Sequence, residues 1–215
     1  MTLAQRAVDI LEPLGRAEWT GLAWVRLGVE QHRVGCLPAA RDALLRALEL
    51  RRAEPFAGLV ASALIALGAV WFDLGEARHA LEAYREALHL AFAEENQTAL
   101  LGALLGLADV AGRFGDGTLT ARSGIALALA ATAEAHRRRH GLGRDAIGPA
   151  VARWSEQVRA GLDPTGNPLA PPGGAPWELP EAMAAAGQLR VAARQPDEAA
   201  LALPFSLISA FGSLQ

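Results

Sequence analysis

Residues 67 to 88 read LGAVWFDLGEARHALEAYREAL, and the spacing of their small and large side chains decides the fold. Leu67 and Gly68 stand in a stretch with helical apolar periodicity, Gly75 interrupts it, and Ala80 lies in a second such stretch. A glycine that follows a helical pattern readily takes the left-handed conformation that ends a helix. The stretch therefore predicts a helix, a tight turn and a second helix packed closely on the first.

This pattern occurs three times with a period of forty residues. The equivalent residues are Trp24, Leu27, Gly28, Gly35, Ala40, Leu44 and Ala47 in frame one, Leu64, Leu67, Gly68, Gly75, Ala80, Tyr84 and Ala87 in frame two, and Leu104, Leu107, Ala108 and Gly115 in frame three. A repeat of this length is typical of arrays of helical hairpins. We expect helices over residues 3–14, 18–34, 37–52, 57–74, 77–95, 97–114, 118–140, 145–162, 178–194 and 197–212.

The composition supports an all-α chain and excludes some partners. Hydrophobic residues make up 52% of the 215 residues, and Ala and Leu, which are good helix formers, dominate them. The formal net charge is -3, from 23 acidic and 20 basic residues, so no broad positive field exists to attract nucleic acid. We therefore expect no nucleic-acid partner.

Targeting signals and cysteine usage point to the cytoplasm. The N-terminal stretch carries Arg6, Asp9 and Glu12 within its apolar pattern, which is unlike a signal peptide. The sequence has no apolar run long enough to cross a bilayer, and its single cysteine, Cys36, excludes an internal disulfide. We expect a cytoplasmic protein without a membrane partner, in which Cys36 is a core or turn residue.

The chain resembles the tetratricopeptide repeat (TPR) family, whose pattern runs W-x2-L-G-x2-Y and then A-x3-F. Frame one has Trp24 at the first position, and frame two has Trp71 where the pattern has Tyr. Frame three departs from the pattern at Ala108 and Ala111, and the period exceeds the family's usual length of about 34 residues. The resemblance covers residues 20 to about 140. It implies a TPR-like α-hairpin solenoid of about three repeats, with additional C-terminal helices.

We expect residues 1–140 to form the repeat array and residues 141–162 an additional helix. Residues 163–177 carry five Pro and three Gly, which indicates an irregular segment that is either a linker or a strap on the array. Residues 178–215 read as a helical pair that could cap the array as a decayed repeat. The uncharged, apolar residues 201–215 either fold back on the array, join a second copy in a homodimer, or belong to a partner interface.

We find no residues in the sequence with the arrangement of a catalytic, cofactor or metal site. His136 and His140 lie one helical turn apart, but three arginines, residues 137–139, stand between them, and this charge disfavours a cation. The cationic cluster before Gly141 instead suits the negative end of a helix dipole. We therefore expect no enzyme, no cofactor and no metal.

The TPR resemblance implies that the first helix of each hairpin lines a concave groove. The residues mapped to this predicted groove are Leu22, Val25, Val29, His32, Arg33, Ser62, Ile65, Phe72, Asp73, Leu105, Asp109 and Arg113. An apolar floor with a charged rim suits a peptide or an amphipathic helix of a protein partner. The expected function is that of a non-catalytic adaptor or regulatory scaffold. The alternative is a sensor module of a bacterial regulator, which would bind a small molecule or signal peptide.

Overall fold

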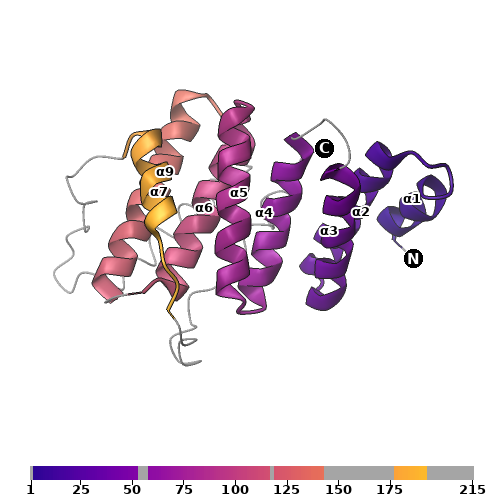
Figure 1. Cartoon of the computed structure of the whole chain (residues 1–215), viewed down its shortest axis with the longest axis horizontal. Coiled ribbons are helices and arrows are strands. Elements are labelled where there is room, and N and C mark those ends of the chain that lie inside the picture. Colours follow the sequence, from indigo (N-terminus) through magenta and orange to yellow (C-terminus); the bar gives the residue numbers. More distant parts are fainter. Residues whose placement is uncertain (1, 53–57, 117–118, 143–176, 193–215) are drawn as a thin grey trace. The chain divides into compact units, whose positions relative to one another are not determined.

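The computed structural model describes residues 2–52, 58–116, 119–142 and 177–192 (Figure 1). Within these ranges every regular element is an α-helix, which confirms the expected all-α class for the described residues. The helices are α1 (Leu3–Leu11), α2 (Ala17–Arg33), α3 (Leu37–Arg52), α4 (Gly58–Asp73), α5 (Ala77–Ala93), α6 (Gln97–Phe114), α7 (Leu119–Arg139) and α9 (Leu179–Gln188). None of them combines the length and apolarity that crossing a membrane requires.

The chain divides into two compact units, Met1–Ala99 and Leu100–Gln215. The boundary falls within α6, near its first turn. The first unit holds α1 to α5, and the second holds most of α6 together with α7 and α9. The expected helices 145–162 and 197–212, the irregular segment up to residue 176 and the apolar residues 201–215 lie outside the described residues.

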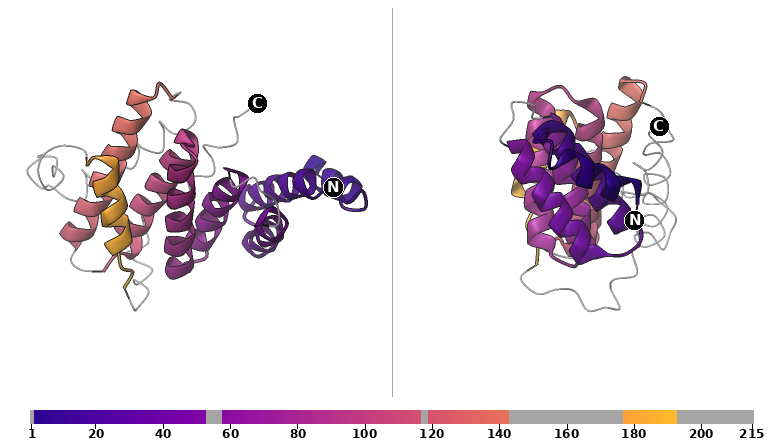
Figure 2. Two further views of the ribbon diagram at one scale, coloured as in Figure 1. Left: turned by 45° about the horizontal axis from the view of Figure 1, so that its top comes forward. Right: turned by 90° about the vertical axis from the view of Figure 1, so that its right-hand side faces the viewer.

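In the first unit, consecutive helices pack as hairpins. Helix α2 packs along α3 and α4 packs along α5, while α3 also contacts α4 and α1 contacts α2 (Figure 1 and Figure 2). Both hairpins bury the alanines at equivalent positions of their second helices, since Ala40 and Ala80 are fully buried. Small side chains at these positions let the backbones of the paired helices approach each other.

The two hairpin turns have the same geometry forty residues apart. Gly35 and Gly75 have φ angles of 81° and 78°, in the left-handed region that glycine tolerates best. After each glycine, the next backbone N–H reaches back to a carbonyl of the last turn, from Cys36 to Gln31 at 2.9 Å in the first turn. The equivalent bond in the second turn measures 2.8 Å. The glycine-ended helices expected from the sequence are confirmed here.

A glycine on the first helix of each hairpin faces a large residue on the second. A Cβ added at Gly28 would lie 2.5 Å from Cγ of Leu44, and one added at Gly68 would lie 2.9 Å from the ring of Tyr84. Neither distance leaves room for a side chain, which explains glycine at both positions. This confirms the close packing of the two helices that the sequence predicts, at Gly28 in the first hairpin and at Gly68 in the second.

In the second unit, a distant segment completes the structure. Gly115 and Val191 form an antiparallel β-bridge, and hydrogen bonds join Asp116 N to Arg190 O at 3.1 Å and Ala192 N to Phe114 O at 2.9 Å. Helix α9 also packs against α7. The chain that follows α6 is therefore held by residues from near the C-terminus.

One expectation for this unit is wrong. The helix expected over 178–194 ends at Gln188, because Leu189 has ψ 134° and the residues after it are extended and pair with the end of α6. Helix α6 ends at Phe114, as expected, and Gly115 follows it without the positive φ of Gly35 and Gly75. A Cβ at Gly115 would lie 2.5 Å from the carbonyl oxygen of Ala111, so the position needs glycine for space.

Candidate functional site

The predicted groove residues of α2 share one face of the helix, and most of them reach solvent. Leu22 is 37% exposed, Val25 and Val29 are half-buried, and Arg33 is exposed. We name Leu22, Val25 and Val29 the α2 stripe. These three residues recur at helical spacing, so their side chains form one apolar band that ends beside the charge of Arg33.

The predicted groove residues of α4 divide differently. Ser62 is exposed and Asp73 is half-buried, but Ile65 and Phe72 are only 3% and 4% exposed. The reason is that α4 is apolar around most of its circumference and buries nearly all of its length. Ile65 and Phe72 are therefore core side chains here and present little surface to a partner.

The three remaining residues of the predicted groove lie on α6 in the second unit. Leu105 is buried, with 3% of its surface exposed, while Asp109 and Arg113 are half-buried. The guanidinium of Arg113 lies over the ring of the neighbouring Phe114, with its carbon 4.9 Å from the ring centre. Arg113 therefore stacks on its own helix end.

The structure brings two predicted groove residues together. Nε2 of His32 on α2 lies 2.6 Å from Oδ2 of Asp73 on α4, and the side chains are 4% and 26% exposed. This contact joins the last turns of two first helices from neighbouring hairpins. Nδ1 of His32 is buried without a hydrogen-bond partner among the described residues. The pair therefore fixes the relative position of α2 and α4, with the imidazole inside and the carboxylate nearer the surface.

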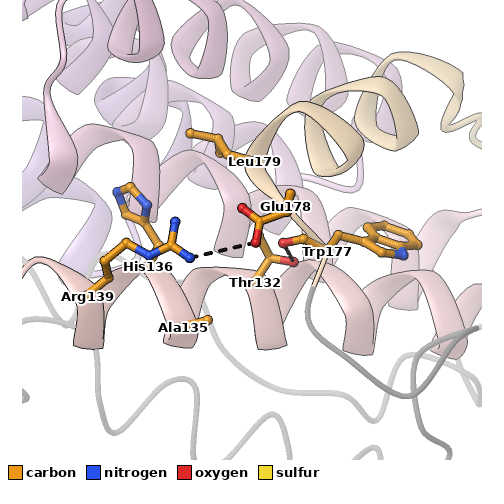
Figure 3. A pocket seen from close by; sticks show the side chains of 7 residues that line it. All are labelled: Thr132, Ala135, His136, Arg139, Trp177, Glu178 and Leu179. Carbon is orange, nitrogen blue, oxygen red and sulfur yellow. Dashed lines mark hydrogen bonds and ion pairs between the residues drawn. The ribbon is translucent and has the colours of Figure 1, made fainter.

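A separate cavity of about 290 Å³ opens between α7 and the start of α9. Its lining mixes apolar, aromatic and charged side chains from both segments (Figure 3). The lining residues are Thr132, Ala135, His136, Arg139, Trp177, Glu178 and Leu179. The size is close to the lower end of the range for small-molecule sites, which begins at about 300 Å³.

Two contacts hold the walls of this cavity together. The Thr132 hydroxyl lies 2.9 Å from the Ala128 carbonyl oxygen on its own helix and 3.2 Å from the Trp177 carbonyl oxygen. Across the cavity, Arg139 reaches toward Glu178 with a nitrogen–oxygen distance of 3.7 Å, as Figure 3 shows. This ion pair is long and well exposed, so both charged groups remain accessible to a ligand.

The histidine of the cavity favours its neutral form. His136 is 9% exposed, and burial lowers the pKa of its imidazole, with further lowering from the nearby charges of His140 and Arg139. Its ring lies against that of His140, with 4.4 Å between the centroids. No group of three His, Cys, Asp or Glu side chains in the described part of the chain is arranged to hold a metal ion.

The arginines of the last turn of α7 do more than complement its dipole. Arg137 is buried, donates to both carboxylate oxygens of Glu134 at 2.7 and 2.9 Å, and donates to the Leu142 carbonyl at 2.8 Å. Arg138 adds a bond of 2.6 Å to Glu134. The hydrogen bond from Arg137, together with that from Arg138 and both positive charges, lowers the pKa of Glu134 to about 2. Arg137 thus holds Leu142, in the chain that follows α7, against the last turn of the helix.

Sequence reasoning missed the cavity because its two walls come from segments far apart in the chain. One local signal was present, since Glu178 and Glu181 form a capping box that starts α9. That signal places the helix start, but it does not show which helix lies opposite.

Comparison with family models, with curated proteins and with solved structures gave no match.

Proposed function

We propose that this chain is a non-catalytic interaction protein, built as a TPR-like array of α-hairpins, that binds a peptide or helix of a protein partner. The observation that carries the proposal is the α2 stripe, an apolar band that stays partly open to solvent. The two hairpins of the first unit, with matching turns and matching glycine contacts forty residues apart, support the repeat architecture.

The chemistry of the α2 stripe favours an amphipathic helix as the partner. Leu22, Val25 and Val29 cover two helical turns, and a partner helix can place apolar residues of the same spacing against them. Arg33 extends beyond the stripe and offers a positive charge to an acidic residue of the partner. The contact between His32 and Asp73 holds the end of α2 in place, so the band is presented on a fixed support.

Site-specific photo-crosslinking in the native cell tests this proposal. A photoreactive residue at Val25 should capture a protein, and the same residue at the exposed Glu82 of α5 is the matched control. Mass spectrometry of the products identifies the partner. In a purified mixture of the two proteins, Val29→Glu should weaken binding by at least about tenfold, because it places a charge in an apolar contact.

Two results would contradict the proposal. One is an identical set of crosslinked proteins from positions 25 and 82, which would mean that capture reflects chance encounters. The other is full binding by the Val29→Glu chain, provided that circular dichroism shows an unchanged helix content. Loss of binding together with loss of helix would instead point to misfolding, and Arg33→Glu, at an exposed position, then serves as the second variant.

We infer a second candidate function, small-molecule sensing, from the cavity between α7 and α9. Arg139 and Glu178 offer opposite charges at one edge, and Ala135, Trp177 and Leu179 offer apolar contacts. A small zwitterion with an apolar side chain, such as an amino acid, matches this combination, since its carboxylate and ammonium groups can replace the long ion pair.

Thermal unfolding with individual amino acids as probes tests the second function. A ligand present at about 100 times its dissociation constant should stabilise the folded chain by about 2.7 kcal/mol. Arg139→Ala should abolish that stabilisation, while Arg138→Ala, an exposed neighbour outside the cavity lining, should retain it. Equal stabilisation of both variants would place the ligand elsewhere on the chain.

A further inference from the structure

Large exposed apolar side chains are concentrated on α1, on the connection that follows it and on the start of α2. Leu3, Ile10, Leu14 and Trp19 are 80%, 60%, 64% and 50% exposed. We name these four residues the N-terminal face. Large apolar side chains that lie exposed within a short stretch of chain are unfavourable in water, and such residues mark a surface that another molecule covers.

Helix α1 has more apolar surface than α2 can cover. Ala4 and Val8 are buried against Ala23 and Leu27 of α2, in one core cluster. Leu3 and Ile10 lie seven residues apart on an adjacent strip of the same helix, and this strip faces away from the cluster. The helix therefore carries two apolar strips, of which only one is packed within the first unit.

Trp19 and Leu14 extend the open strip beyond α1. Trp19 stands one turn before Ala23 on the same side of α2, and Ala23 packs against α1. Leu14 lies in the connection between the two helices. The N-terminal face thus combines a strip of α1, the connection and the first turn of α2.

The charges beside the strip indicate what covers it. Arg6 and Asp9 lie on one flank of Leu3 and Ile10, and both are exposed. When two copies of one helix pair antiparallel about a two-fold axis, the same flank of each meets the other in reverse order. Arg6 of one copy then lies opposite Asp9 of the second, and the contact occurs twice. A parallel two-fold pair would instead place this flank opposite the other flank of the strip, which carries the uncharged Ala7 and Leu11.

We propose that two copies of this chain associate through their N-terminal faces, with the α1 helices antiparallel and Arg6 paired with Asp9 of the other copy. The proposal concerns α1 and the start of α2, and it is independent of the α2 stripe and of the α7–α9 cavity. A self-complementary patch needs no second gene product to cover it, and isologous dimers are the commonest assemblies of soluble proteins.

Sedimentation equilibrium of the full chain over a wide concentration range tests the proposal. We expect a dimer for the natural chain and a monomer for Ile10→Glu, whose new charge falls in the centre of the apolar contact. Val34→Glu is the matched control, since Val34 is 74% exposed and lies at the end of α2, so this variant should remain dimeric.

Charge exchange makes the test specific for antiparallel pairing. Arg6→Asp gives a copy with two acids on the flank, and Asp9→Arg gives a copy with two bases. Each variant alone should dimerise at least about tenfold more weakly, because like charges then face each other. An equimolar mixture of the two should form a heterodimer, and the double variant R6D/D9R should form a homodimer close to the natural affinity.

Three outcomes would overturn the proposal. A natural chain that stays monomeric at all concentrations would show that the face is not self-associating. A dimer that survives Ile10→Glu would place the interface elsewhere. Charge variants that do not form a heterodimer in the mixture would exclude the antiparallel contact. Circular dichroism of each variant controls for folding, and the exposed positions chosen keep the core intact.

Discussion

The hairpins α2–α3 and α4–α5 differ from the α7–α9 region in how each is held together. In the hairpins, the contacts that define the turn and the helix crossing join residues within about twenty positions of one another, such as Gly68 and Tyr84. In the α7–α9 region, the end of α6 pairs with residues near the C-terminus, at Gly115 and Val191. A regular repeat is thus built from local contacts, whereas the second unit depends on a returning segment.

The two hairpins share one backbone geometry, although the side chains that pack inside them and line their surfaces differ. The hairpins share their turn and crossing geometry although Leu44 in one is replaced by Tyr84 in the other. Their exposed surfaces differ, because α2 keeps an open stripe and α4 is buried along most of its length. The backbone pattern is therefore repeated, while the surface chemistry of each repeat is its own.

The largest effects should come from the side chains that fill the space over the helix glycines. Tyr84→Ala should lower the free energy of unfolding by about 3 to 5 kcal/mol and Leu44→Ala by about 2 to 5 kcal/mol, because each leaves a cavity beside a glycine that cannot fill it. Both residues are almost fully buried. Urea denaturation measures the loss. Glu82→Ala, at an exposed position of α5, is the control, and an equal loss there would refute the assigned packing.

The next effect concerns the buried arginine of the second unit. Arg137→Ala should lower the free energy of unfolding by about 2 kcal/mol, because Glu134 and the Leu142 carbonyl both lose a charged donor. Arg139→Ala, which removes only a long and exposed pair, should change it by less than about 0.5 kcal/mol. Comparable losses of unfolding free energy from both variants would contradict the larger contribution assigned to the contacts of Arg137.

Acid should weaken the same contact. The pKa of Glu134 is lowered to about 2 in the folded chain, so its stabilisation is complete above the ordinary value near 4.5 and disappears as the pH falls toward 2. Allowing for the partial exposure of the pair, we expect a loss of about 1 to 2 kcal/mol over this interval. Denaturation at a series of pH values measures it. Glu134→Gln should remove this part of the pH dependence, and an unchanged profile would contradict the assignment.

Replacing glycine by alanine should lower the stability at the hairpin turn and raise it within α7. Gly35→Ala should destabilise by about 1 to 2 kcal/mol, because alanine is strained at the positive φ of the hairpin turn. Gly124→Ala in α7 should stabilise by about 0.5 to 1 kcal/mol, since the position is helical and no atom lies within 4 Å of the added Cβ. Thermal unfolding compares the two. The same sign for both would remove the distinction between turn and helix glycines.

The hairpins could be predicted from the sequence because their signals are local. Gly35 and Gly75 end helices at the expected positions, and Gly28 and Gly68 mark the crossings. The periodic pattern does not separate exposed from buried apolar residues, so it predicts the same role for Ile65 and Val25 although only Val25 reaches solvent. Which side of a helix its neighbours cover depends on contacts beyond the hairpin.

The candidate site is less predictable from the sequence because its residues meet through contacts between separate helices. His32 and Asp73 were both expected at the predicted groove, but their direct contact depends on how α2 and α4 approach each other. The cavity beside Thr132 needs Trp177 from a distant segment, and no short-range pattern links the two. Glu134 and Arg137 stand three residues apart on one helix, so helix spacing alone predicts their ion pair.

The bridge between Gly115 and Val191 also bears on the order of folding. A hairpin closes a short loop, whereas this bridge joins two segments that lie far apart in the sequence of the second unit, with a larger loss of chain entropy. Structures with a low average sequence separation of contacts form faster. We therefore expect α2–α3 and α4–α5 to fold first and residues 189–192 to dock last. During synthesis, the two hairpins would form first, and the end of α6 would stay unpaired until residues 190–192 have been made.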